Sequence, residues 1–312
     1  MDSRLRELGA SGVRIRGGDR STLKRANHWL SNCFISDFSR IDRVYAPALQ
    51  FNGCGLAATN NLICDSPHHG MRTDGNDIYI ARNEVHSVVY EYSDQSGIDI
   101  FCDPTFRGIV IEENLWRHIG SSFALCGQAG IRLDDTISGV VMIGNVFYRS
   151  SGGNFGGIQI HGGKDNLALD NVFVDCKQAF SFSPWSDERY RTFVKERFPE
   201  NVGKQAFVDA YPFFDEIFEN PNRNFIVGNV AINGELFNRN GDGLNVFFAN
   251  MLRTVETPEN VDAFLTDSKA LRAWLEEVSG RKLDKIGLRE NWNGAEAPVS
   301  PMFTTPTPAS RH

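Results

Sequence analysis

A short phrase that begins with Asn and continues with alternating apolar residues recurs along most of the chain. Consecutive copies start 22 to 31 residues apart, except that the last step spans 58 residues. The seven copies are Asn32–Ile35, Asn61–Cys64, Asn83–His86, Asn114–Arg117, Asn145–Tyr148, Asn171–Val174 and Asn229–Ile232. Short alternating strands at this spacing, separated by Gly, Asn and Asp, predict the coils of a right-handed parallel β-helix. The fold class we expect is therefore all-β.

The repeated asparagines are predicted to be structural. Asn tolerates the left-handed backbone region and hydrogen-bonds locally, so it suits the sharp turn that each coil needs. Because the coils stack, the Asn side chains of successive turns should also meet. We therefore expect a ladder of stacked asparagines, each of them placed in the turn itself.

A second strand precedes the Asn phrase, and its apolar positions align in five coils. The five segments are Leu49–Asn52, Met71–Asp74, Ile98–Phe101, Ile131–Asp134 and Ile158–His161. Alternation along a strand places the first and third residues of each segment inside the solenoid and the second and fourth outside. Neighbouring coils stack at about 4.8 Å, so residues at equivalent outward positions should touch.

Two outward columns follow from this register. One contains Gln50, Arg72, Asp99, Arg132 and Gln159, and the other contains Asn52, Asp74, Phe101, Asp134 and His161. Alternating Arg and Asp beside a His predict a groove with a chemical function. The alternative is a solvated face whose charges merely pair across strands.

Acidic residues gather around this predicted groove. Asp134 and Asp135 leave the end of one strand together, and adjacent carboxylates repel unless they are hydrogen-bonded, paired or shifted in pKa. Asp94, Asp99 and Asp103 lie on the preceding coil. Glycoside hydrolysis needs two facing carboxyl groups, and neighbouring coils supply separations of about 5 to 10 Å, which span the retaining and inverting geometries. The alternative role for Asp94, Asp103 and Asp135 is to cap backbone N–H groups in turns.

The step of 58 residues is too long for one coil and predicts an insertion at about 180–224 within a β-helix that covers residues 1–255. The insertion is rich in aromatic residues, and much of it has helical spacing. Its rings, Trp185 among them, either stack on sugar faces as part of a lid or anchor the insertion to the body.

The chain after the last coil is predicted to close the solenoid. Residues 256–294 form a capping segment, in which an amphipathic helix at 258–279 should cover the open end and its unpaired edges. Residues 295–312 are rich in Pro and Thr and are expected to be a disordered tail.

Composition excludes some classes of partner. The 312 residues carry a net charge of −7, which argues against a nucleic-acid binder. No apolar run approaches the roughly 18 to 20 residues of a membrane-spanning helix, and we expect a monomer without a membrane partner. Met1–Arg4 lack an apolar signal region, while Gly12–Ile15 already predict a strand, so we expect the chain to begin partway into a domain.

The six cysteines fall at irregular spacings without a C-x-x-C pair. They are Cys33, Cys54, Cys64, Cys102, Cys126 and Cys176. This pattern favours free, buried thiols and argues against a zinc site or a redox motif. Disulfide bonds are the alternative if the protein is exported.

Several short runs resemble bacterial secreted parallel β-helix proteins of the carbohydrate-active kind. They include Gly17–Arg20, Tyr45–Ala48, Pro67–His69, Gly75–Asp77, Asp103–Gly108, Leu133–Asp135, Ser138–Gly139 and Gly162–Asn166. The resemblance covers most of residues 12–290 and is strongest to glycoside hydrolase family 141, whose members act on plant cell-wall glycans, including fucosides and xylan. It implies a carbohydrate substrate, no cofactor and an extracellular or periplasmic location.

This family is associated with a pair of catalytic aspartates on neighbouring coils, which the resemblance matches to Asp94 and Asp135, with Asp134 beside them. The chain departs from the family's pattern where Pro104 replaces a Trp and Asp99 replaces an aromatic residue. The candidate substrate-binding residues are Arg72, Asp74, Asp99, Asp103, Arg132, His161, Lys164, His68 and Trp185.

Two other functions stay open at this point. A polysaccharide lyase would need a base to remove the proton next to a uronate carboxyl group, and a cation to neutralise that group. The candidate bases are His68, His69, His161 and Lys164, and the candidates for neutralisation are Arg72, Arg132 and a Ca²⁺ ion held by Asp99 and Asp103. The third alternative is a glycan-binding solenoid without catalysis.

Overall fold

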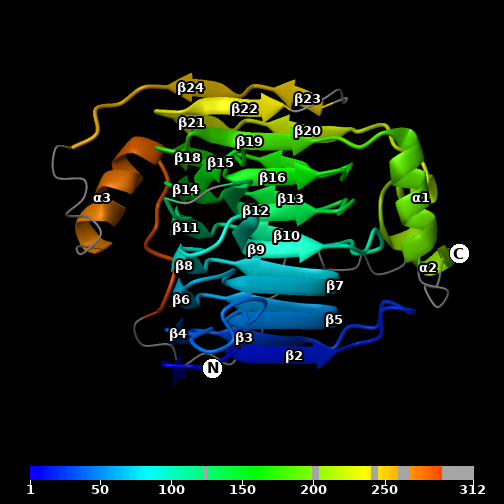
Figure 1. Ribbon diagram of the computed structural model, residues 1–312, viewed down its shortest axis with the longest axis horizontal. Coiled ribbons are helices and arrows are strands. Elements are labelled where there is room, and N and C mark those ends of the chain that lie inside the picture. Colours follow the sequence, from blue (N-terminus) through cyan, green and yellow to red (C-terminus); the bar gives the residue numbers. More distant parts are fainter. Residues whose placement is uncertain (123–124, 199–203, 240–244, 259–267, 290–312) are drawn as a thin grey trace, which may run out of the picture.

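The chain winds into a solenoid whose strands form three faces (Figure 1). The computed structural model describes residues 1–122, 125–198, 204–239, 245–258 and 268–289. Strands of successive coils pair in parallel, and the right-handed parallel β-helix predicted from the Asn spacing is confirmed.

Faces 1 and 2 belong to one continuous sheet, because two long strands bend from one face into the other. These two strands are β5 (Leu49–Thr59) and β7 (Met71–Ala81). Face 1 contains their first halves with β2 (Val13–Gly17), β9 (Gln95–Phe101), β12 (Gly127–Asp134), β16 (Ile158–His161), β19 (Gln178–Ser183) and β22 (Glu235–Arg239). Face 2 contains their second halves with β3 (His28–Ser31), β10 (Val110–Glu112), β13 (Val141–Ile143), β17 (Leu167–Leu169), β20 (Asn224–Val227) and β23 (Asn245–Phe248).

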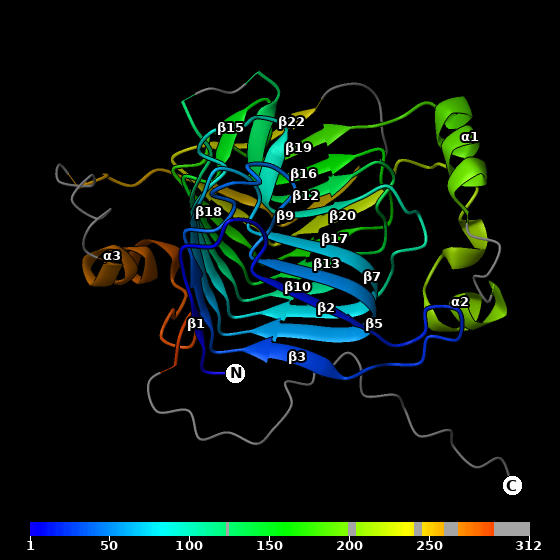
Figure 2. The ribbon, with the colours of Figure 1, turned by 60° about the horizontal axis from the view of Figure 1, so that its bottom comes forward.

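Face 3 is a separate sheet, with nine strands among the residues that the structure describes. It contains β1 (Arg4–Leu5), β4 (Phe34–Ser36), β6 (Leu62–Ser66), β8 (Glu84–Val88), β11 (Leu115–Ile119), β14 (Val146–Tyr148), β18 (Val172–Val174), β21 (Val230–Ile232) and β24 (Met251–Arg253). A short strand, β15 (Ser151–Gly153), lies off the faces and pairs antiparallel with the start of β12, beside face 1 (Figure 2).

The predicted register of face 1 is confirmed. Gln50 pairs with Arg72, Arg72 with Asp99, and Asp99 with Arg132, which in turn pairs with Gln159. The charged column is therefore continuous over five coils. The inward residues between these positions are buried, and each such aliphatic side chain stabilises the fold by about 1.5–3 kcal/mol relative to an exposed one.

The Asn ladder forms, but one residue away from the turn. Each ladder Asn except the last donates through Nδ2 to Oδ1 of the next, at 2.9–3.0 Å. The ladder consists of Asn61, Asn83, Asn114, Asn145, Asn171, Asn229 and Asn250. The left-handed backbone lies at the preceding residue, as at Asn60, Arg82 and Glu113, with φ of 55°, 54° and 52°. The prediction that the ladder residue makes the turn was wrong, because its amide side chain points inward and bonds buried backbone groups instead.

The first Asn phrase was also assigned one position out of register. Phe34 pairs with Leu62, which places Cys33 rather than Asn32 opposite Asn61. The Cys33 amide donates to Asn61 Oδ1 at 2.9 Å, while Asn32 has the left-handed φ of 55° that precedes the ladder.

The insertion lies between β19 and β20 and carries α1 (Asp187–Arg197), α2 (Lys204–Ala210) and the short 3-10 helix η1 (Phe214–Glu216). Ser186 caps α1 by accepting a hydrogen bond from the Arg189 amide. Most of its aromatic rings pack on one another in a buried cluster that includes Tyr190 and Phe207 and, from the solenoid, Leu23. Their main role is therefore to form a small core within the insertion. No helix in the described part of the chain is long and apolar enough to cross a membrane.

The C-terminal helix covers a flank of the solenoid, so the prediction that it caps the open end was wrong. α3 (Ser268–Ser279) packs on face 3, on the side opposite the insertion (Figure 1). The physical reason is an outward apolar column on face 3, including Leu115 and Val146, which needs cover from Leu271 and Leu275. The predicted start of this helix, at 259–267, and the predicted tail at 295–312 lie outside the described residues.

All six cysteines are free. Four are buried as expected, whereas Cys102 is half-buried and Cys126 is exposed. The expectation of buried thiols is therefore wrong for these two.

Candidate functional site

The site is built around Arg132, which projects outward from β12 on face 1. Its guanidinium lies 2.9 Å from Asp94 Oδ1, 3.3 Å from Asp99 Oδ1 and 2.7 Å from Asp134 Oδ2. The three aspartates come from the loop before β9, from β9 itself and from the end of β12. Coil stacking therefore brings together three residues that the sequence separates. We call Arg132 and its acidic and His neighbours, Asp94, Asp99, Asp134, Asp135 and His161, the acidic cluster.

His161 connects the two adjacent aspartates at the end of β12. Its Nδ1 atom lies 2.7 Å from Asp134 Oδ1 and 3.4 Å from Asp135 Oδ1. Burial lowers the pKa of His161, but the hydrogen bonds to Asp134 and Asp135 outweigh burial and raise it to about 9. His161 is therefore an imidazolium ion at neutral pH.

Asp135 is held in its ionised form. The hydrogen bond from His161 is the main cause of its lowered pKa, and the Cys102 thiol donates to its other oxygen at 3.5 Å. Burial raises the pKa of Cys102 to about 12, so this thiol keeps its proton. Asp135 and Thr136 have φ of 47° and 73°, and backbone strain of this kind at a β-branched residue is concentrated at functional sites.

Asp99 forms the floor of the cluster. Burial raises its pKa to about 6, although Arg132 acts in the opposite direction. This carboxyl group can therefore take up a proton near pH 6. It is fully covered by its neighbours and does not itself reach the surface.

Three members of the acidic cluster are accessible, two of them carboxyl groups. The side chains of Asp94, Asp135 and His161 are 53%, 27% and 27% exposed, compared with 12% for Asp134. Asp135 lines a cleft of about 460 Å³ between the end of β12 and helix α1, a volume in the range of small-ligand sites. The opposite wall includes Trp185 and Arg189.

The next coil continues the polar groove. Arg72 Nε donates to both oxygens of Asp74, at 3.0 and 3.1 Å, and its guanidinium lies 4.0 Å from the centre of the Phe101 ring. Arg72 and Asp74 therefore lie in the groove as predicted, paired with one another.

Lys164 and His68 do not join the groove. Lys164 is fully buried beneath the insertion, where its Nζ donates to the Glu216 carbonyl at 2.6 Å, and burial lowers its pKa to about 8. His68 is also buried, and its pKa falls to about 4 for the same reason. Its Nδ1 lies 2.7 Å from Nδ1 of His69. Neither side chain is open to a ligand, because the insertion covers Lys164 and the rings of Tyr45 and Tyr92 pack on His68.

Trp185 and Asp103 also differ from expectation. Trp185 is only 4% exposed, since its ring packs on His161 and Phe193 and is covered by the Arg189 guanidinium at 3.6 Å. It supports the wall of the cleft and offers no free ring face. Asp103 accepts a hydrogen bond from the Thr105 amide at 2.9 Å, which is the turn-capping alternative.

Sequence reasoning missed the polar residues of α1 that line the cleft, namely Glu188, Arg189 and Glu196. Their signal in the sequence is the cap at Ser186 followed by helical spacing, which does not show where the helix docks. Two clusters among the described residues have the composition of a metal site: Asp134 with Asp135 and His161, and Cys64 with Asp65 and His86. In the first, the proton on His161 competes with any cation.

Comparison with known families agrees with the fold. A model of the right-handed beta helix region matches residues 47–204, which is half of the chain. The chain belongs to the right-handed β-helix family. Domains of this family occur in pectate lyases and in glycoside hydrolases, which indicates a role related to carbohydrates. No curated protein and no solved structure matches the chain.

Proposed function

We propose that this β-helix protein is a glycoside hydrolase that acts on a plant or algal cell-wall glycan. The observation that carries the proposal is the convergence of four carboxyl groups on Arg132 and His161, with Asp94 and Asp135 accessible from the groove. Membership of a family rich in carbohydrate-active enzymes supports it, as does the resemblance to glycoside hydrolase family 141.

The two accessible carboxyl groups suit different roles. Asp135 has a lowered pKa and faces the cleft, so it is the carboxylate that attacks the sugar or activates water. Asp94 is half exposed and is the other carboxyl group of the cluster that a bound sugar can reach, so we assign it the protonation of the leaving oxygen. Asp134 contacts both Arg132 and His161 and acts as a positioning residue.

A lyase mechanism has weaker support. Lys164 and His68 are buried away from the groove, and His161 already carries a proton, so none of these is a base for a bound sugar. The negative charge of the acidic cluster also repels a uronate carboxylate.

The test is a screen of the purified protein against fucosylated, xylan-type and uronate-rich glycans, in which new reducing ends and ultraviolet absorbance are measured together. We expect reducing ends without absorbance. On the substrate found, Asp94→Asn and Asp135→Asn should each reduce kcat by about 10²–10⁴-fold, the usual contribution of a catalytic acid or base.

Asp103→Asn is the matched control, because Asp103 serves a turn on the same coil as Asp94. The Asp103→Asn variant should turn over the substrate as the wild type does. Turnover retained in both Asp94→Asn and Asp135→Asn would overturn the assignment of the pair. An absorbing product would identify a lyase, and glycan binding without turnover would identify a binding solenoid.

A further inference from the structure

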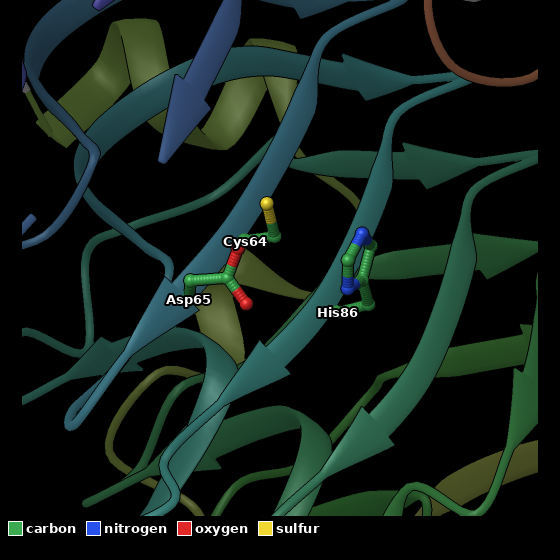
Figure 3. A group of neighbouring side chains, drawn as sticks. All are labelled: Cys64, Asp65 and His86. Atoms are coloured by element: carbon green, nitrogen blue, oxygen red, sulfur yellow. The ribbon is translucent and has the colours of Figure 1, made fainter. Parts of the chain in front are cut away.

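A second cluster of reactive side chains lies on face 3, away from the groove. Cys64 and Asp65 come from β6, and His86 comes from the neighbouring strand β8 (Figure 3). One ligand atom from each of the three residues, a sulfur, an oxygen and a nitrogen, lies within 4.8 Å of the other two. These are three atoms of the kinds that bind zinc in proteins.

The fold itself brings these atoms together. Cys64 pairs directly with His86 in the parallel register, so their side chains leave the sheet on the same side. Neighbouring residues of a regular strand point to opposite sides, which would turn Asp65 away from Cys64. Asp65 has a left-handed φ of 61°, and this break in the alternation leaves its carboxylate beside the thiol.

Hydrogen bonds orient the ligand side chains. The Nδ1 atom of His86 lies 3.0 Å from Ser87 Oγ; a proton on Nδ1 shared with that hydroxyl leaves Nε2 to bind a metal. Cys64 is only 4% exposed, and its thiol is hydrogen-bonded to Asp65.

The charges around the site are nearly balanced, so the negative charge for a cation comes from Asp65 and the Cys64 thiolate. Arg117 and Arg272 both lie near His86, and Glu84 binds both of them, Arg117 at 2.7 Å. Asp37 adds a second negative charge near the thiol. Asp65 is exposed, so a metal ion can enter from solvent and a water molecule can complete its coordination.

We propose that Cys64, Asp65 and His86 bind one zinc ion with a water molecule as the fourth ligand. On binding, the Cys64 S–H bond breaks, its proton passes to solvent and the thiolate sulfur coordinates the metal. Borderline-soft Zn²⁺ accepts this mixture of sulfur, nitrogen and oxygen, whereas Ca²⁺ and Mg²⁺ select oxygen ligands. The cysteine spacing argued against zinc because it contains no C-x-x-C pair, but here the second coil supplies the missing ligand.

The experiment uses the full chain, freed of metal by dialysis against a chelator, and ZnCl₂ in competition with a chromogenic chelator. We expect one tight equivalent of Zn²⁺, and the loss of this equivalent in Cys64→Ser, Asp65→Asn and His86→Gln. Co²⁺ provides a second readout, because a thiolate ligand gives it a charge-transfer absorption band that Cys64→Ser should abolish.

Two controls separate this site from other metal ligands. Cys126→Ser removes the exposed thiol, and His161→Gln removes the nitrogen ligand of the other candidate cluster. Both should keep the zinc equivalent. Unchanged binding in His86→Gln, or loss of binding in His161→Gln, would overturn the proposal. If Cys64→Ser does not fold, His86→Gln and the Co²⁺ spectrum of the unaltered chain still decide between these outcomes.

Discussion

Replacing His161 by Gln tests the electrostatics of the acidic cluster independently of any substrate. The folded protein holds the pKa of His161 at about 9, compared with 6.5 for an unperturbed His. A group whose pKa is raised by folding contributes stability that is fully present below its unfolded pKa and is lost as pH rises through its folded pKa. Stability from His161 is therefore complete at acidic pH and falls between pH 6.5 and 9.

The expected magnitude follows from proton linkage. Between pH 6.5 and pH 8 the unfolded chain releases the His161 proton while the folded protein mostly keeps it, which costs the wild type about 1.5 kcal/mol of unfolding free energy. Lys164 acts with the opposite sign over the upper part of this range, because burial lowers its pKa to about 8. Since both proteins retain Lys164, its contribution cancels when they are compared.

The assay is urea unfolding at pH 6.5 and pH 8 for the wild type, His161→Gln and the control His28→Gln, whose side chain is exposed. The difference between the two pH values should be about 1.5 kcal/mol smaller in His161→Gln and unchanged in His28→Gln. For a chain of this length the same difference corresponds to about 2 °C in the melting temperature. If His161→Gln keeps the pH dependence of the wild type, His161 is not the imidazolium ion that links Asp134 to Asp135.

Three further changes probe the fold around the site. Asn114→Ala should cost about 3 kcal/mol or more in thermal unfolding, because it leaves buried hydrogen-bonding groups unpaired, whereas the exposed Asn52→Ala should cost little. Tyr211→Phe removes the 2.9 Å hydrogen bond to the half-buried Asp77 carboxyl group and should lower the unfolding free energy by about 1.5–3 kcal/mol; a negligible change would show that this bond does not anchor the insertion. Burial raises the pKa of Asp99 to about 6, so its contribution to stability is lost as pH rises from 4 to 6. Asp99→Asn should abolish this part of the decrease, and a decrease equal to that of the wild type would contradict the assignment.

The sequence was sufficient to predict the solenoid and the register of face 1, because both follow from periodicity. In a parallel β-helix, a residue's place in the repeat determines its face and its neighbours on adjacent coils, so Arg72, Asp99 and Arg132 could be aligned from apolar positions alone. The ladder was predictable for the same reason. The exact turn residue was not, since Asn60 and Asn61 are chemically identical and only the inward direction of the ladder side chain separates them.

What could not be predicted depends on the segments that leave the repeat. Lys164 follows the outward His161 by three residues in the sequence, yet the insertion covers it completely. Trp185 lies beside the cleft but is buried against α1, which docks through contacts that no periodicity encodes. The contact between Cys64 and His86 could have been predicted from their equivalent positions in the repeat. Asp65 joins this pair only through a left-handed backbone that the sequence does not specify.

The geometry of Arg132 limits how the acidic cluster can be dissected. One guanidinium nitrogen, Nη2, contacts both Asp94 at 2.9 Å and Asp134 at 2.7 Å, so moving either carboxylate changes the position of the other. An alanine at Asp94 would free the guanidinium to move toward Asp134, and an alanine at Arg132 would leave buried Asp99 without its counter-ion. Neither variant isolates one catalytic group. Isosteric Asp→Asn changes keep the size of the side chain and one acceptor oxygen for Arg132, while they remove the charge and the transferable proton, and a kcat loss in those variants therefore reports on the carboxyl group far more directly.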